Sequence, residues 1–318
     1  MFSNKWLIHD LMLNCYRLAE EKQSQLAVFS RYSKRYAIKK QMEHYYMKKV
    51  VTIAGSDATG GGGLEADLKT FQEFGTFGLA AITSIVNLDP NDGTHHLYSL
   101  SEELIQEQLA SVFAGPIEAI KTGLLPSKEI IELVSARIPK NIPLIADPVI
   151  GGKGTQDFIQ NDQVRALRES LLPQALITTP NLREAGILSE MGELTSEKHM
   201  QEAAKKIALF GVQHVVIKGG ARLDTKQTLD LHYDGRNFQR YPHPVIATPY
   251  NHGAGCTFAA AITAAIAKNY PVEQAIKLAI DFVQVAIAMG EKINPYVGHV
   301  WHGAYTHGEK RLEYSDEQ

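Results

Sequence analysis

Short hydrophobic runs alternate with amphipathic stretches from residue 47 through most of the chain. The hydrophobic runs end near polar residues or glycine, which predicts buried β-strands at 50–55, 117–121, 144–147, 175–178 and 214–218. Between them, apolar residues recur at three- and four-residue spacing, which predicts helices at 129–137, 163–171 and 197–210. This alternation predicts an α/β fold in which helices cover both faces of a mainly parallel sheet.

Polar residues and glycines follow each of the predicted strands. In a parallel sheet the carboxyl ends of the strands lie at one edge, where α/β proteins bind their ligands. We therefore expect one shared site to be built from the segments that follow the strands: Gly55-Ser56-Asp57, Lys121-Thr122-Gly123, Asp147-Pro148, Pro180-Asn181 and Lys218-Gly219-Gly220. A further turn-rich stretch at 87–97 is either a flap over the site or a simple β-turn.

The first 46 residues differ from the rest of the chain. They contain no glycine or proline, eight aromatic residues and a net charge of +4, so the remainder carries −7. Three interpretations are open: an amphipathic helical appendage with Leu11, Cys15 and Leu18 on one face, a targeting segment, or an upstream extension of a protein that starts at Met47. We favour the third, with residues 47–318 as one large α/β domain.

Composition narrows the function classes. The chain has 318 residues, 44% of them hydrophobic and 21% charged, which excludes a disordered or collagen-like protein. Its net charge of −3 favours neither nucleic acid nor an anionic membrane as partner. Two cysteines are too few for a disulfide framework, and the apolar stretch at 258–267 ends at Lys268, well short of the roughly 18 residues of a membrane span. We expect a cytoplasmic protein.

The segment 251–257, Asn-His-Gly-Ala-Gly-Cys-Thr, runs directly into the alanine-rich helix. Gly253 and Gly255 allow a tight turn whose backbone N–H groups, with the positive end of the helix, would bind an anion. A cysteine at such a helix start is expected to have a depressed pKa, which makes Cys256 a candidate base or nucleophile. The alternative is that Cys256 is a small residue filling a tight turn.

A second glycine-rich segment, 57–67, follows the first predicted strand. Its four consecutive glycines permit close approach of a ligand to the backbone. The spacing fits neither the dinucleotide-binding fingerprint nor the phosphate loop that ends in Lys-Ser or Lys-Thr. A flexible turn before a helix remains the alternative.

Two carboxylates and the histidines complete the candidate chemistry. Glu184 stands three residues after Asn181, as in a capping box, or it lies near a metal-bound phosphate. Asp147 ends a predicted strand and is either a turn residue or an oxygen ligand for Mg²⁺. The 12 histidines include no zinc motif, and we expect His302 and His307 to be solvated tail residues. The chain has no Gly-x-Ser-x-Gly hydrolase elbow.

Taken in order, these segments resemble the ribokinase-type superfamily, and within it the branch of pyridoxine/pyridoxal kinases and hydroxymethylpyrimidine (phosphate) kinases. The matching residues span about 47–298 and are 53–57 with Gly60-Gly61, 66–71, 121–123, 147–149, 179–181 with Glu184, 218–220 and 252–257. The resemblance implies a three-layer αβα sandwich and a kinase that uses ATP and Mg²⁺ to phosphorylate a hydroxymethyl group on a heteroaromatic ring.

The resemblance also implies roles for individual residues. The anion hole and base would be Gly253, Ala254, Gly255 and Cys256. The nucleotide would be bound by Gly255 together with Asn181, Lys218, Gly219, Gly220, Ala221 and Arg222. Glu184 and Asp147 would hold the metal ion, and the substrate ring would be bound by Gly55, Asp57, Leu88 and His96.

Two differences from the family's sequence pattern bear on the identity of the substrate. The pyrimidine kinases resemble one another in a glutamine at the position of Leu88, so Leu88 favours pyridoxine/pyridoxal (vitamin B6) as substrate over hydroxymethylpyrimidine. Some pyridoxal kinases have a second cysteine after the Asp-Pro-Val strand, where this chain has Gly151-Gly152. A pyrimidine kinase of thiamin biosynthesis and an inactive ligand-binding homologue remain alternatives. The resemblance implies a homodimer and a small-molecule partner.

Overall fold

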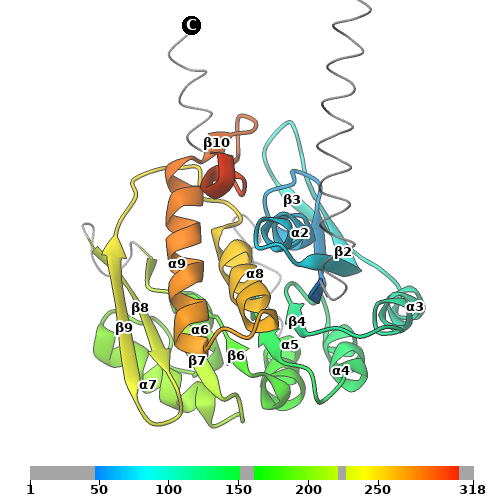
Figure 1. Ribbon diagram of the computed structural model, residues 1–318, viewed down its shortest axis with the longest axis horizontal. Coiled ribbons are helices and arrows are strands. Elements are labelled where there is room, and N and C mark those ends of the chain that lie inside the picture. The colour runs from blue at the N-terminus through cyan, green and yellow to red at the C-terminus, as the bar shows by residue number, and fades with distance from the viewer. Residues whose placement is uncertain (1–46, 151–160, 221–226, 308–318) are drawn as a thin grey trace, which may run out of the picture. The chain divides into compact units, whose positions relative to one another are not determined.

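The computed structural model describes residues 47–150, 161–220 and 227–307, and Figure 1 shows the arrangement of their helices and strands. Nine strands of the described residues form one sheet in the order β3-β2-β1-β4-β5-β6-β7-β8-β9. Six of them are parallel: β1 (Lys49–Asp57), β2 (Phe77–Leu88), β4 (Ala119–Thr122), β5 (Leu144–Ala146), β6 (Ile177–Thr178) and β7 (His214–Ile217). The five strands predicted from apolar runs are therefore confirmed as the sheet centre.

Antiparallel strands lie at both edges of the sheet: β3 (His95–Ser99), β8 (Gln227–Tyr233) and β9 (Phe238–Pro244). The turn-rich stretch at 87–97 is the hairpin between β2 and β3. Asp89 Oδ1 accepts from the Asn91 N–H at 2.8 Å, and Asp92 Oδ1 accepts from the Thr94 N–H at 2.8 Å, so both aspartates hold the turn closed. A separate pair of short strands, β10 (Glu291–Lys292) and β11 (Gly298–His299), lies outside this sheet.

One face of the sheet is covered by α3 (Glu102–Val112), α4 (Lys128–Arg137), α5 (Asn161–Ala166), α6 (Leu182–Leu188) and α7 (Glu197–Ala208). The other face is covered by α2 (Gly63–Glu73), α8 (Ala254–Ala267) and α9 (Val272–Ala288), and Figure 1 shows α8 and α9 side by side. Val51 packs on the first group, whereas its neighbour Val50 packs with α2 and α8, as the alternation along a strand requires. The predicted three-layer sandwich is confirmed.

The helix predicted at 163–171 differs from expectation. Its α-helical part, α5, ends at Ala166, and the chain continues as a π-helical turn, Leu167–Leu171, and a 3₁₀ turn, Leu172–Gln174. Pro173 lies in that last turn and has no N–H to donate to a carbonyl of the preceding turn. The apolar spacing gave no sign of this change, because the predicted range of 163–171 ends before Pro173.

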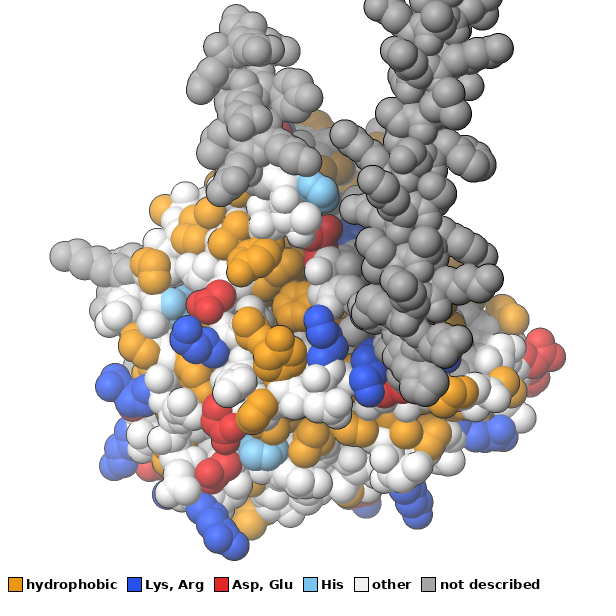
Figure 2. Space-filling view, in the orientation of Figure 1, with side chains coloured by type: hydrophobic (Ala, Val, Ile, Leu, Met, Phe, Trp, Pro, Cys, Tyr) orange, Lys and Arg blue, Asp and Glu red, His pale blue; other side chains and the backbone are white. Residues whose placement is uncertain are grey.

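Among the described residues, no helix combines the length and apolar character that a membrane span requires. On the face drawn in Figure 2, the Lys and Arg side chains of the described residues are scattered between acidic and neutral ones. The leader at 1–46, Gly151-Gly152, and the nucleotide-site predictions for Ala221 and Arg222 lie outside the described residues. The domain boundary at Met47 stays a prediction.

Candidate active site

The carboxyl ends of β5, β6 and β7 bring three predicted site residues together. Lys218 Nζ lies 3.3 Å from Asp147 Oδ1, and Thr179 Oγ1 donates to the same oxygen at 3.1 Å. Asn181 pairs with Lys218 through a β-bridge between their backbones. Asp147 is 3% exposed, so its charge is balanced by a specific ion pair rather than by water.

Glu184 lies beside this group at the start of α6. Its Oε2 accepts from the Asn181 N–H at 2.8 Å, and Asn181 Oδ1 accepts from the Glu184 N–H at 3.0 Å, which confirms the capping box. Burial raises the pKa of Glu184 to about 7; Lys218 opposes this shift and the charge of Asp147 adds to it. The two carboxylates are thus close enough to repel each other, and a bound cation would relieve that repulsion.

Lys218 faces the turn that precedes α8. A Cβ placed on Gly255 would be 3.3 Å from Lys218 Nζ, so the ammonium lies against the first turn of that helix. Burial alone would lower the pKa of Lys218, but Asp147 and Glu184 raise it above its ordinary value. The lysine therefore stays charged at neutral pH and adds a fixed positive charge to the positive end of α8.

The turn itself has the geometry expected from its glycines. Gly253 has φ +86°, and a Cβ there would be 1.7 Å from the carbonyl oxygen of Gly61. The N–H groups of the first turn of α8 have no partner within the helix, although that of Ala254 donates to Asn251 O at 3.3 Å. The Ala254 N–H is thus partly engaged in the turn, and the anion hole predicted at Gly253, Ala254 and Gly255 stays a prediction.

Cys256 lies in the first turn of α8 and is partly exposed. The expectation of a depressed pKa is wrong: burial raises the pKa of this thiol to about 12, which outweighs the lowering by Lys121 and by the Gly63 N–H. The negative charges of Asp147 and Asp67 add to the rise. The positive end of a helix is therefore not enough to lower the pKa of this buried thiol.

The second glycine-rich segment folds around Asp57. Its Oδ1 accepts from the Thr59 N–H at 2.8 Å and from the Thr59 hydroxyl at 2.6 Å, and its Oδ2 accepts from the Gly62 N–H at 2.8 Å. His252 Nε2 lies 3.0 Å from the same Oδ2. Burial alone would raise the pKa of Asp57, but hydrogen bonds from His252 and Thr59 hold it well below its usual range. Asp57 thus ties this turn to the turn before α8.

The remaining residues predicted for the substrate lie on the same side as this turn. Gly55 is close to β2, since a Cβ there would be 2.7 Å from Ser84 Oγ. Leu88 and His96 line a cavity of about 510 Å³ beside the β2–β3 hairpin, together with Ala58, Thr59, Asn87, Asp89, Pro90, Tyr98, Asn294, Pro295 and Tyr296. Neither Cys256 nor Asp147 lines this cavity, so the structure does not join the two groups.

Gly219 and Gly220, which are predicted to border the nucleotide, differ in their surroundings. The Gly219 N–H donates to Asp230 Oδ1 at 3.0 Å, and a Cβ on Gly219 would be 2.1 Å from Leu229 O, so Gly219 packs closely on β8. Gly220 has φ +55°, and no described residue comes within 4 Å of its Cβ position.

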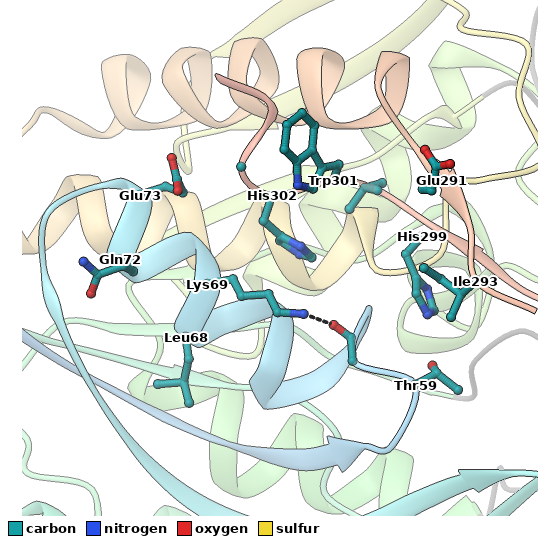
Figure 3. Close-up of a pocket in the computed structure, with 13 residues that line it drawn as sticks. Thr59, Leu68, Lys69, Gln72, Glu73, Glu291, Ile293, His299, Trp301 and His302 are labelled. Carbon is teal, nitrogen blue, oxygen red and sulfur yellow. Dashed lines mark hydrogen bonds between the residues drawn. The ribbon is translucent and has the colours of Figure 1, made fainter. Parts of the chain in front are cut away.

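A second cavity, of about 580 Å³, lies on the outer side of the Gly60 turn and is shown in Figure 3. Lys69 on α2 points across it and donates to Gly60 O at 2.5 Å. His302 lines this cavity, and its Nε2 lies 3.0 Å from Thr257 Oγ1 on α8. The prediction that His302 is a solvated tail residue is wrong, since it is 5% exposed; His307 is exposed.

Sequence reasoning also missed a buried ion pair beneath the site. Lys121 Nζ lies 2.9 Å from Asp67 Oδ2, and both side chains are 0% exposed. The Thr52 hydroxyl donates to the same oxygen at 2.5 Å. The available signal was a lysine within an otherwise apolar strand, which requires a buried partner.

The comparisons with known proteins decide the family. A family model described as phosphomethylpyrimidine kinase matches residues 57–301. The chain belongs to this family. The matched segment contains the two glycine-rich turns, the carboxylates of Asp147 and Glu184, and the ion pair of Lys121 with Asp67.

Individual relatives are of two kinds. The chain is 45% identical to a pyridoxine kinase of Bacillus subtilis over 264 residues, which are 81% of this chain and 97% of that protein. It is 39% identical to a hydroxymethylpyrimidine/phosphomethylpyrimidine kinase of the same organism over 242 residues, 75% of this chain and 89% of that protein. A solved pyridoxal kinase of Staphylococcus aureus, in complex with AMP-PCP and pyridoxal, has a TM-score of 0.77 and 42% identity over 82% of this chain and 95% of that one. The ribokinase-like fold that the sequence predicted is confirmed.

Proposed function

We propose that this protein is an ATP-dependent kinase that phosphorylates the 5′-hydroxymethyl group of pyridoxine, pyridoxal and pyridoxamine. The observation that carries the proposal is the group of Asp147, Glu184 and Lys218 facing the first turn of α8. This arrangement offers cationic and backbone donors for phosphates next to carboxylates for their metal ion. The 45% identity to a pyridoxine kinase supports the choice of substrate.

The transferring phosphoryl group would lie at the turn of Gly253 and Gly255. Charge that develops on its oxygens in the transition state would be stabilised by the N–H groups of this turn and by Lys218. Asn181, Gly219 and Gly220 would border the nucleotide, with Ala221 and Arg222 next along the chain. The positive φ of Gly253 supports this role, because glycine adopts the left-handed conformation that begins α8 at this turn without strain.

The donor set fits Mg²⁺. Asp147 and Glu184 supply buried carboxylate oxygens, which are the ligands that Mg²⁺ prefers, and each is already oriented by a hydrogen bond within the protein. When bound, Mg²⁺ would neutralise negative charge on the phosphates of ATP. Lys218 holds Asp147 in place, so the lysine orients a metal ligand as well as contacting phosphate.

Cys256 would accept the proton of the substrate hydroxyl. In that step the hydroxyl O–H bond breaks, its proton moves to Cys256 Sγ, the hydroxyl oxygen bonds to the γ-phosphorus, and ADP leaves with the electrons of the broken P–O bond. Burial raises the pKa of Cys256, so the thiol would first lose its own proton to solvent before it accepts the proton of the hydroxyl.

The substrate ring would lie between the Gly55 strand end and the β2–β3 hairpin, with Leu88 and His96 contacting it. Asp57 would act indirectly, since both of its oxygens are bonded within the two turns. The cavity beside the hairpin supports this placement, because Leu88 presents an apolar surface to it where an amide would select a pyrimidine.

A steady-state assay of ADP release with ATP, Mg²⁺ and either pyridoxal or hydroxymethylpyrimidine tests the proposal. We expect kcat/KM to be higher for pyridoxal by about tenfold or more. A preference of that size for hydroxymethylpyrimidine would instead assign the second candidate function, a kinase of the thiamin precursor, which the 39% identical relative favours. Ligand binding with no ADP release from either compound would indicate an inactive homologue.

We also infer that the protein is a homodimer that acts in the cytoplasm, as the resemblance of its motifs to the family implies. Sedimentation equilibrium of the full chain tests the first point, since a dimer has twice the 35.2 kDa mass of the chain. Fractionation of cells that make the protein tests the second, with kinase activity in the membrane or periplasmic fraction as the contrary result.

A further inference from the structure

The ion pair of Lys121 and Asp67 has no part in the proposed chemistry, and yet it lies within the core. Both side chains are 0% exposed, and removing two charges from water is costly even when they pair. A pair of apolar residues would fill the same space at no such cost.

Only one of the two carboxylate oxygens of Asp67 accepts hydrogen bonds. Its Oδ2 accepts from Lys121 Nζ at 2.9 Å and from Thr52 Oγ1 at 2.5 Å. Its Oδ1 has no hydrogen-bond partner within the part of the chain that the structure describes. Burial raises the pKa of Asp67 to about 6, and Lys121 and Thr52 oppose that rise, so the carboxylate is charged at neutral pH.

The ion pair lies close to the thiol of Cys256. Ala119 of β4, Ala260 of α8 and Phe71 of α2 belong to one packed cluster. Lys121 lies two residues after Ala119 on the same face of its strand, and Cys256 and Asp67 lie one helical turn before Ala260 and Phe71, so these three side chains meet at the next level toward the strand ends. A Cβ on Gly123, at the end of β4, would be 3.2 Å from Lys121 Nζ, so the ammonium lies just below the strand tips. α2, α8 and β4 pack against one another around this point.

The charges of Lys121 and Cys256 therefore act on each other directly. Among the influences on the thiol that oppose its burial, Lys121 is the largest. In return, Asp67, Cys256 and Asp147 together raise the pKa of Lys121 above its ordinary value, although burial alone would lower it. The lysine is thus a permanent cation with two possible anionic neighbours, a carboxylate on one side and a thiolate on the other.

We propose that Lys121 is a positioning residue that stabilises the thiolate form of Cys256, and that Asp67 limits how much of the lysine charge the thiolate experiences. This rests on the proposed role of Cys256 as the base of the kinase reaction. Lys121 touches neither substrate nor nucleotide; it acts through the sulfur. In the reaction the thiol would first release its own proton to solvent, Lys121 would stabilise the resulting thiolate, and that thiolate would then take the proton of the substrate hydroxyl.

The rate of alkylation of Cys256 by iodoacetamide, measured against pH, tests the proposal without any kinase turnover, because only the thiolate reacts. A Cys15→Ser background leaves Cys256 as the one thiol of the full chain, and Cys256→Ser in that background is the blank. Lys121→Met should slow alkylation at fixed pH by about tenfold, and Asp67→Asn should speed it by about tenfold, each equal to about one pKa unit. Thr52→Val, which removes a hydrogen bond and no charge, should change the rate much less.

Because Lys121→Met should slow alkylation and Asp67→Asn should speed it, the two variants distinguish an effect of charge from an effect of looser packing. A variant that merely loosened the core would expose the thiol and speed alkylation in both cases, and that result would overturn the proposal, as would an unchanged rate in Asp67→Asn. If Lys121→Met does not fold by circular dichroism, the isosteric Asp67→Asn still decides. If the unsubstituted protein showed no kinase activity and the variants still gave the expected alkylation rates, the proposed function would be refuted and the Lys121–Cys256 coupling would stand.

Discussion

Replacing Gly253 with alanine tests whether the turn before α8 stabilises the transferring phosphoryl group. Gly253 has φ +86°, and that left-handed conformation costs an alanine about 1–2 kcal/mol. The added Cβ would also stand 1.7 Å from Gly61 O, a contact that only movement of one turn can relieve. Because the N–H donors must point at one position, we expect kcat to fall by about 10²–10³, the cost of losing one such donor.

Gly75→Ala is the matched control. Gly75 has φ +68°, nothing lies within 4 Å of its Cβ position, and it is at the far end of α2 from the site. Gly75→Ala therefore carries only the cost of placing an alanine in the left-handed conformation. That cost corresponds to a fall in Tm of about 2–8 °C for a chain of this size. Steady-state kinetics and thermal melts of both variants give the comparison. If Gly253→Ala kept kcat within threefold of Gly75→Ala, the anion-hole reasoning would be refuted.

Three further predictions concern single side chains of the site. Cys256→Ala should lower kcat by about 10²–10⁴ in the ADP-release assay if the thiol takes the substrate proton, and full retention of activity would remove it from the mechanism. The raised pKa of Glu184, about 7, should contribute stability that is present below pH 4.5 and lost as the pH rises through 7. Thermal melts from pH 5 to 8 should show this slope, and Glu184→Gln should reduce it to the part that the raised pKa of Asp67 contributes; an unchanged slope would contradict the assignment. Lys218→Met should raise KM for ATP at least tenfold while KM for pyridoxal changes little, and the reverse pattern would place the lysine on the substrate side.

The sheet centre could be predicted because buried parallel strands are continuous apolar runs, as at β1 and β5. The edge strands escaped prediction because they are partly exposed and polar, as β9 shows with Arg240 and His243 among its residues. The positions of the site residues followed from the strand ends. Their contacts, such as that of Lys218 with Asp147, lie 71 residues apart and have no local signal.

Charge states were the hardest property to foresee. The depressed pKa expected for Cys256 rested on the helix start alone, and burial beside Asp147 and Asp67 reverses the direction. Lys121 and Asp67 belong to motifs that the sequence analysis used, but their pairing across 54 residues depends on how α2 packs against β4. Local pattern identifies which residues carry chemistry, and tertiary packing decides whether they are charged.

The two turns joined by Gly61 and Gly253 come from opposite parts of the chain, so the order of synthesis matters for this protein. About 200 residues separate the end of β1 from the start of α8, and a ribosome needs about 10–40 s to add them. Until α8 emerges, Val50 and Ala119 lack the Ala260 surface that covers them. The nascent chain therefore spends that interval with apolar strand surface exposed, the condition under which unfinished chains aggregate.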